Sequence, residues 1–358
     1  MKSNLGKSAY TSGVGGAIAL CVSTVVGLTT LPAQSALLVS SSGDNSIKQY
    51  DETTGAYIRD FVTSGSGGLF NPQGLTLGPN GNLFVASGDS VKEYSGTTGE
   101  YIKDFAGSGL SDAKGLSFAP DGSLFVVSDF IPGTEQEVAG PNVVSWSSGL
   151  LQYDGTTGEL IGNIPTGGSG RGLIATGPQP VDVVIGGPDN NLFISSGSAR
   201  FNSGGIGVYD STTRAPVGGL PNQVSFLDPG GLAVDDSDIF YTNFSTSVGR
   251  ADLATGIGDS SFIGSGELNG AEDVTIGSNG NLFVSDFGSD SIKQYDRQTG
   301  DFLGDFVASG SGGLSAPTYV TTANVPVPEP SSVLGVLAFG GLFAGGALRR
   351  KRGVKLPK

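Results

Sequence analysis

Apolar and polar residues alternate along the chain in short runs, and these runs repeat. One recurring pattern joins two alternating runs through a turn of Pro, Asn, Asp or Gly, as in residues 75–85 and 116–126. Alternation with a period of two on both sides of a tight turn predicts a β-hairpin. Further copies of this first hairpin occupy residues 183–194, 232–241 and 274–284.

A second hairpin follows in every copy of the repeat. Its apolar residues alternate on both sides of an Asp-x-x-Thr-Gly turn or a close variant, in which Asp accepts backbone hydrogen bonds and Gly tolerates a positive φ. The copies span residues 47–58, 91–102, 150–161, 208–217, 248–257 and 292–303. Two consecutive hairpins predict a unit of four antiparallel strands.

The spacing of the repeats predicts the fold. Strands of the Leu-Phe-Val type begin at residues 37, 83, 124, 192, 239 and 282, so that successive starts lie 46, 41, 68, 47 and 43 residues apart. Four strands in roughly 40 to 45 residues is the period of a β-propeller blade. The first copy lacks its opening strand, whereas residues 316–322 are an opening strand with nothing after it. We therefore predict an all-β, six-bladed propeller over residues 37–322, closed by this C-terminal strand.

The N-terminus has the features of a secretory signal peptide, which we assign to residues 1–36. Lys2 and Lys7 precede an apolar stretch, and Ala33 and Ser35 are small residues at the −3 and −1 positions of a cut after Ser35. A cut after Ala36 is the alternative. A first transmembrane helix is the other interpretation, although the apolar run is short and rich in Gly and Thr.

The C-terminus combines a proline-rich stalk, an uncharged run and a basic end. The stalk, residues 323–330, ends in Pro328, Glu329 and Pro330. Residues 331–348 are uncharged and long enough to span a bilayer, so we predict a transmembrane helix within the tail, residues 331–358. The cations that follow, which would stay on the cytoplasmic side, are Arg349, Arg350, Lys351 and Arg352.

This order of elements resembles the PEP-CTERM sorting signal of Gram-negative bacteria. The resemblance implies an exported protein that is first tethered to the inner membrane and then reaches the cell surface or extracellular matrix. It also implies an exosortase-type sorting peptidase as partner and an association with exopolysaccharide. A permanent single-span membrane anchor is the alternative.

The blade pattern Gly-Leu…Pro-Asn-Gly-Asn-Leu-Phe-Val resembles the NHL repeat and the wider group of gluconolactonase-like six-bladed propellers. NHL blades usually carry an Asp four places after the Leu. At that place this chain has Ser41, Ser87, Ser128, Ser196, Asn243 and Asp286. Five departures in six weaken the transfer of the family's ligand-binding residues.

Composition and charge exclude several classes of function. The chain has 33 acidic and 19 basic residues; without the basic ends and Glu329, 32 acids face 11 cations in the expected body. Such a body repels phosphate backbones, so we expect no nucleic acid partner. The one cysteine, Cys21, lies in the signal peptide and there is no histidine, which excludes disulfides, thiolate catalysis and imidazole catalysis in the mature chain.

Candidate binding residues lie where the innermost strands start and the second strands end, because these loops surround the channel mouth of a propeller. The first strands contribute Gln73, Lys114, Asp182, Glu272, Asp273 and Thr318, and the second strands contribute Asp129, Asn243 and Asp286. Converging carboxylates would suit Ca²⁺ or Mg²⁺, whereas turn-capping or solvated acids are the plainer interpretation. The insertion at residues 131–147 is expected to rim this mouth.

Two functions remain open. The first is a surface or matrix protein that binds polysaccharide or envelope proteins without catalysis, which the sorting tail and the missing catalytic residues favour. The second is a hydrolase or lactonase of the gluconolactonase-like type, which a metal-bound water and a carboxylate base could run without histidine.

Overall fold

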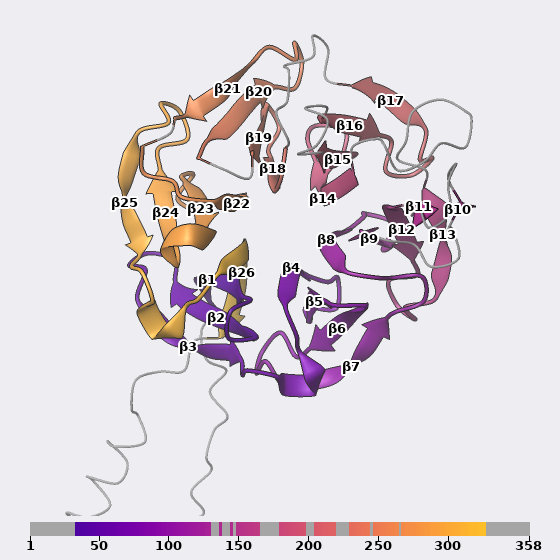
Figure 1. Ribbon diagram of the computed structural model, residues 1–358, viewed down its shortest axis with the longest axis horizontal. Helices are drawn as coiled ribbons and strands as arrows, with labels where there is room; N and C mark the ends of the chain where they lie inside the picture. Colours follow the sequence, from indigo (N-terminus) through magenta and orange to yellow (C-terminus); the bar gives the residue numbers. More distant parts are fainter. Residues whose placement is uncertain are drawn as a thin grey trace, which may run out of the picture. The chain divides into compact units, whose positions relative to one another are not determined.

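A computed structural model describes residues 33–129, 136–137, 144–145, 148–164, 179–197, 204–219, 229–243, 246–264 and 266–326. Six four-stranded antiparallel sheets follow one another around a central axis, which confirms the predicted six-bladed propeller (Figure 1). The described residues also form three short 3-10 helices between strands, η1 (Ser66–Gly68), η2 (Phe287–Ser289) and η3 (Ser311–Gly313). The predicted signal peptide up to residue 32 and the predicted span at 331–348 lie outside the described residues.

Each blade contains four neighbouring strands, of which the innermost is named first. Blade 1 consists of β26 (Pro317–Pro326), β1 (Ala33–Ser41), β2 (Ser46–Asp51) and β3 (Tyr57–Val62). Blade 2 consists of β4 (Pro72–Leu77), β5 (Leu83–Ser87), β6 (Ser90–Tyr94) and β7 (Tyr101–Ala106). Blade 3 consists of β8 (Ala113–Phe118), β9 (Leu124–Ser128), β12 (Gly149–Tyr153) and β13 (Leu160–Ile164).

The remaining blades follow the same order. Blade 4 consists of β14 (Gln179–Gly186), β15 (Asn191–Gly197), β16 (Gly205–Tyr209) and β17 (Pro216–Gly219). Blade 5 consists of β18 (Leu232–Val234), β19 (Asp238–Thr242), β20 (Val248–Asp252) and β21 (Gly258–Ile263). Blade 6 consists of β22 (Ala271–Ile276), β23 (Leu282–Asp286), β24 (Ser291–Tyr295) and β25 (Phe302–Val307). Within the insertion of blade 3, β10 (Gln136–Glu137) and β11 (Val144–Ser145) form a separate two-stranded sheet.

The ring is closed by strands from the two ends of the described chain, as predicted. β26 is the innermost strand of blade 1 and pairs antiparallel with β1, with Leu37 opposite Thr322. The pairing continues four residues beyond each end of the predicted body, to Ala33 opposite Pro326. Closure by a strand from the far end of the chain leaves no exposed inner edge between first and last blade.

The outer hairpins owe their shape to the turn that the repeats predict. Asp154 Oδ1 accepts hydrogen bonds from the backbone N–H groups of Thr156 at 2.9 Å and Thr157 at 2.8 Å. Gly158 ends the turn at a φ of 78°. A Cβ at Gly158 would also overlap the carbonyl group of Phe105 in the preceding blade, so this glycine is needed for the turn and for the close approach of blades.

The core lies mainly between neighbouring blades. Tyr94 of blade 2 is fully buried and packs with Leu38 and Ile47 of blade 1. Its hydroxyl donates to the carbonyl oxygen of Ser66, in the connection between the two blades, at 2.9 Å. This packing of Tyr94 between two blades explains why a single blade has no complete core of its own.

Hydroxyl groups near the ends of second strands connect several blades to the next one, as blades 4 and 6 show. Ser195 Oγ donates to the carbonyl oxygen of Gly230 at 2.6 Å, and Ser285 Oγ donates to that of Thr318 at 2.8 Å. The acceptors stand at or just before the start of the following inner strand. These bonds therefore fix the positions at which the inner strands enter the channel.

No helix among the residues that the structure describes is long and apolar enough to cross a membrane.

Candidate functional site: the central channel and its mouth

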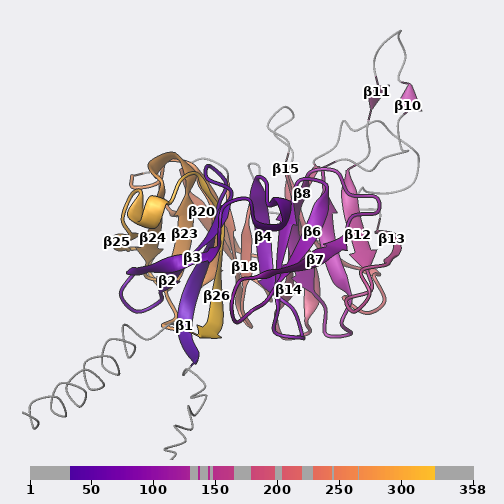
Figure 2. The same ribbon diagram turned by 90° about the horizontal axis from the view of Figure 1, so that it is seen from below.

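The six inner strands place equivalent residues in layers around the central channel. Figure 2, which views the ring from its side, shows β4, β14, β18 and β26 running across its thickness. All six inner strands begin at one face, which we call the mouth face. Equivalent positions at or near the starts of these strands form one layer of the channel wall, which we call the first layer: Tyr319, Gly74, Gly115, Asp182, Gly231 and Asp273.

Opposite charges meet at the mouth. Lys114, at the start of β8, places Nζ 3.0 Å from Asp129 Oδ2 and 4.0 Å from Asp112 Oδ2. Glu272 is the second residue of β22 in blade 6, three blades away around the ring. Burial raises the pKa of Glu272, and the positive charge of Lys114 offsets part of that rise. The structure thus brings three of the predicted mouth residues into one electrostatic group.

Among the described residues, two aromatic side chains are exposed on the mouth face. Phe70, just before β4, is 67% exposed, and Phe287, just after β23, is 43% exposed. Sequence reasoning missed Phe70, although the repeats contain a signal for it: the equivalent connections carry Ser111 and Ser315 at its place. A large apolar residue that replaces serine on an exposed loop has no core to fill, so a contact with a ligand is a natural reason for it.

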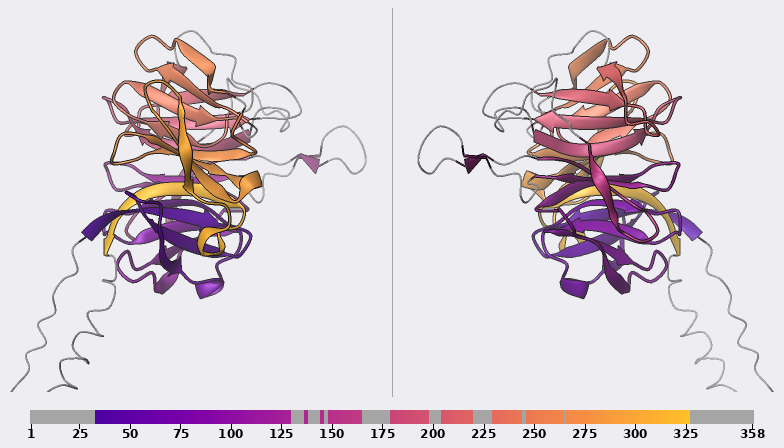
Figure 3. Two further views of the ribbon diagram at one scale, coloured as in Figure 1. Left: turned by 90° about the vertical axis from the view of Figure 1, so that its left-hand side faces the viewer. Right: turned by 90° about the vertical axis from the view of Figure 1, so that its right-hand side faces the viewer.

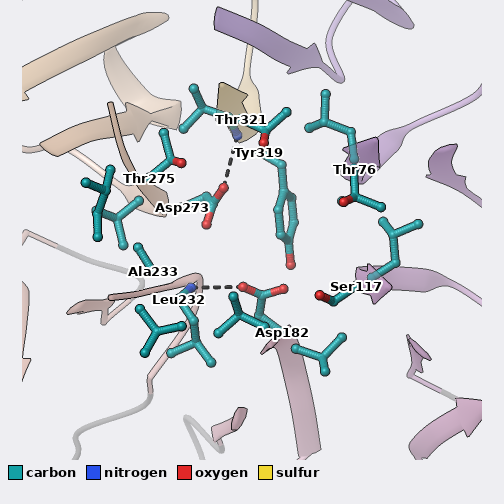
Figure 4. A pocket seen from close by; sticks show the side chains of 18 residues that line it. Thr76, Ser117, Asp182, Leu232, Ala233, Asp273, Thr275, Tyr319 and Thr321 are labelled. Atoms are coloured by element: carbon teal, nitrogen blue, oxygen red, sulfur yellow. Dashed lines mark hydrogen bonds between the residues drawn. The ribbon is translucent and has the colours of Figure 1, made fainter. Parts of the chain in front are cut away.

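A cavity of about 230 Å³ lies in the channel beneath the mouth. Asp182, Asp273 and Tyr319 line it at the level of the first layer (Figure 4). Two residues further along the inner strands, the hydroxyl-bearing side chains that line it are Thr76, Ser117, Thr275 and Thr321. The cavity therefore reaches toward the face opposite the mouth.

Tyr319 extends across the channel. It belongs to β26 of blade 1, and its hydroxyl donates to the carbonyl oxygen of Val181 in blade 4, on the opposite side of the ring, at 3.2 Å. Burial raises the pKa of Tyr319 well above its ordinary value, and the charges of Asp182 and Asp273 raise it further. Since its side chain spans the channel from blade 1 to blade 4, Tyr319 narrows the passage from the mouth into the cavity.

The two channel aspartates fasten neighbouring inner strands. Asp182 Oδ2 accepts the backbone N–H of Leu232 at 2.9 Å, which ties β14 to β18. Asp273 Oδ2 accepts the backbone N–H of Val320 at 3.0 Å, which ties β22 to the closing strand β26. A Cβ at Gly115 would overlap the Asp182 carboxylate, so glycine in the preceding blade makes room for this acid.

Burial sets the protonation of this acid pair. It raises the pKa of Asp182 to about 7, and the backbone N–H groups of Leu232 and Val183 offset only part of the rise. Burial also raises the pKa of Asp273 well above its ordinary value, and the nearby charge of Asp182 raises it further. Both carboxyl groups therefore hold protons at a pH at which exposed carboxylates are ionised.

Two other predicted mouth residues stabilise nearby loops through hydrogen bonds. Asp286 is fully buried and accepts hydrogen bonds from the backbone N–H of Asn269 at 2.8 Å and from Ser289 Oγ at 2.6 Å. Asn243 donates from its side-chain amide to Ser247 Oγ. Neither residue lines the cavity. Within the described part of the chain, no three His, Cys, Asp or Glu side chains gather as metal ligands would.

Comparison with known families identifies the C-terminus. Residues 326–352 match the model of the PEP-CTERM protein-sorting motif. The chain therefore carries a PEP-CTERM sorting motif at its C-terminal end. The match contains every residue predicted for sorting, from Pro328, Glu329 and Pro330 to the basic cluster 349–352, all of which lie outside the described residues. The motif marks a PEP-CTERM protein as exported, and exosortase is the peptidase that recognises it.

Solved structures that are similar to this chain support its fold. A chain in the crystal structure of a nidogen/laminin complex matches with a TM-score of 0.57 at 15% identity, covering 81% of this chain and 98% of that one. A functionally unknown protein from Desulfotomaculum acetoxidans matches with a TM-score of 0.51 at 13% identity, covering 81% and 99%. At these identities the matches show the propeller fold alone, with which an NHL-like ring is consistent. No curated protein matches the chain.

Proposed function

We propose that this exported propeller binds a neutral polysaccharide of the cell surface or extracellular matrix across its channel mouth. The observation that carries the proposal is the pair of exposed rings, Phe70 and Phe287, beside the polar mouth residues. Apolar faces with a few placed polar groups are what ligand sites in proteins offer. Sugar rings present C–H groups on their faces and hydroxyls at their edges, so they match both components.

The positions of the two rings suit an extended ligand. Phe70 precedes the inner strand of blade 2 and Phe287 follows the second strand of blade 6, so they flank blade 1 from either side. Between and beyond them the mouth offers donors and acceptors on Gln73, Lys114 and Glu272. A flexible sugar chain that contacts both rings would run over these polar side chains.

Charge decides which polysaccharide class is favoured. The chain carries a net charge of −14 at pH 7. An acidic glycan would meet repulsion at such a surface, whereas a neutral glycan would not. The insertion of blade 3 follows β9, whose end lies on the mouth face, and its β10–β11 sheet pairs with no blade. This extra element supports a role for the mouth face beyond ring stability.

The test is a binding measurement with the full-length chain purified in detergent. Neutral and acidic fractions of the native matrix polysaccharide are immobilised, and retention of the wild type is compared with that of the double variant Phe70→Ala, Phe287→Ala. We expect retention on the neutral fraction only, and a loss of at least about tenfold in the double variant, since each stacking contact contributes roughly 0.5–1.5 kcal/mol beyond its area burial.

Phe302→Ala is the matched control, because Phe302 is an exposed aromatic residue on the outer strand β25. This variant should bind as the wild type does. Retention of an envelope protein without any retention of polysaccharide, or equal losses in control and double variant, would contradict the proposal.

The metal-dependent hydrolase is not supported as a second function by a specific observation. Asp182 and Asp273, the acids that line the channel cavity, accept backbone N–H groups of neighbouring inner strands. That structural role accounts for both carboxylates.

A further inference from the structure

The first strand of the ring begins inside the expected signal peptide. β1 starts at Ala33, whereas the expected cut follows Ser35. The segment before the cut pairs with the end of the closing strand β26: Ala33 with Pro326, Gln34 with Val325, and Ser35 with Asn324. Figure 3 shows indigo β1 lying along yellow β26.

The expected cut site is sealed once β26 is in place. Ala36, the residue after the cut, is fully buried and pairs with Ala323 of β26 on one side and Asp51 of β2 on the other. A peptidase needs the scissile segment extended and free of other partners. Because β26 is at the C-terminal end of the ring, it is exported last, and the signal peptide has to be removed before this strand docks.

Removal of the signal peptide leaves the end of β26 without a partner. The segment Asn324–Pro326 then has no strand on the side where Ala33–Ser35 lay, whereas the buried side chain of Val325 still packs near Ala36 and Leu38. Unpaired backbone groups at a strand edge are a template for another strand. A cut after Ala36 would uncover Ala323 as well.

This uncovered edge adjoins the sorting motif. Pro328 is only two residues beyond the end of β26, which at full extension is about 7 Å of chain. The matched sorting motif itself begins at Pro326, the last residue of the strand. A peptidase that acts on the Pro-Glu-Pro segment must therefore approach the edge of β26.

We propose that signal-peptide removal uncovers the edge of β26 at Asn324–Pro326, and that the sorting peptidase docks on this edge by adding a strand to it. Strand addition supplies main-chain hydrogen bonds that read no side chain, and the adjoining proline motif supplies the specificity. The inference rests on the expected cut near Ser35 and is independent of the ligand at the mouth.

The test keeps Ala33–Ser35 on the mature chain. In the full-length protein, Thr30→Ala and Pro32→Ala create a cut before Ala33, while Ser35→Thr blocks the original cut and keeps the hydroxyl that contacts Glu52. N-terminal sequencing verifies the new start. We expect tail removal in the exporting cell, followed by pulse-chase, to slow at least about tenfold, because the retained pairs restore one or two net backbone hydrogen bonds over the docking edge.

Adding Gln34→Pro to the same variant gives the matched control. The retained segment has the same length, but proline has no N–H to donate and disrupts the pairing. Tail removal should return to the wild-type rate. Amide exchange of residues 322–325 in the purified chains should be about tenfold slower in the first variant than in the wild type. The inference would be overturned if the first variant and the wild type showed equal amide exchange at these residues. It would also be overturned if their tails were removed at equal rates.

Discussion

The substitution Asp182→Asn isolates the consequence of a buried charge in the channel. Asp182 is 5% exposed, and its Oδ2 accepts the N–H of Leu232 from the next blade. Asparagine has nearly the same shape and keeps an oxygen that can accept this hydrogen bond. The variant therefore removes the titration of the side chain without opening a cavity.

The sign of the effect follows from the raised pKa. Burial moves the pKa of Asp182 from 3.8 to about 7, so between these values the folded chain holds a proton that the unfolded chain has released. The free energy of unfolding then falls as the pH rises through this window. A pKa shift of this size corresponds to a contribution of about 4 kcal/mol to the free energy of unfolding at low pH, and nearly all of this contribution is lost by pH 7.5. The asparagine side chain of the variant does not titrate, so this loss is absent.

The assay is urea unfolding of wild type and variant, followed by far-ultraviolet circular dichroism, at pH values from 4 to 7.5. The wild type should lose stability across this range, and Asp182→Asn should be the more stable protein at pH 7.5. Equal pH slopes in the two proteins, or a variant that is less stable at pH 7.5, would refute the reasoning.

Asp154→Asn is a control with the opposite sign. Hydrogen bonds from the backbone N–H groups of Thr157 and Thr156 lower the pKa of Asp154. Its contribution to stability is therefore present above the unfolded pKa and is lost as the pH falls through the folded pKa. This variant should lose stability at neutral pH, where Asp182→Asn gains it.

Two further substitutions test the channel. Tyr319→Phe deletes the hydroxyl that donates to the carbonyl oxygen of Val181 across the ring. It should lower the free energy of unfolding, measured with urea, by about 1 kcal/mol. An unchanged value would mean that this hydrogen bond contributes nothing to stability. Gly115→Ala places a Cβ against the Asp182 carboxylate, so it should destabilise the ring by several kcal/mol, as overpacking of a core does. Gly162→Ala is the control, because a Cβ at Gly162 meets no atom within 4 Å, and it should shift the melting temperature little.

The fold could be predicted from the repeats because the residues that form each turn are close together in the sequence of every blade. The Asp154 turn and its relatives recur at one place per blade, and the incomplete first copy paired with the leftover strand at 316–322 fixed the closure. The ends of that closure were harder to predict, since residues 33–35 read as the cut site of a signal peptide while their pairing partners lie almost 300 residues away.

The site was less predictable because it depends on contacts between blades. Lys114 and Asp129 were expected at the mouth and form an ion pair, and the charge of Lys114 acts on the pKa of Glu272. Asp182 and Asp273 were expected there too, but they connect neighbouring inner strands through hydrogen bonds. Only the three-dimensional ring shows that glycine in one blade makes room for the acid of the next. The crossing of the channel by Tyr319 likewise depends on blade 4 standing opposite blade 1.

Amide hydrogen exchange of the full-length chain, with and without the neutral matrix polysaccharide, tests the central claim most directly. We predict that bound polysaccharide slows exchange around Phe70 and Phe287 and at the start of β8, and leaves the outer strands unchanged. Protection confined to the outer strands, or no protection at the mouth at saturating polysaccharide, would contradict the assignment of the mouth as the binding site.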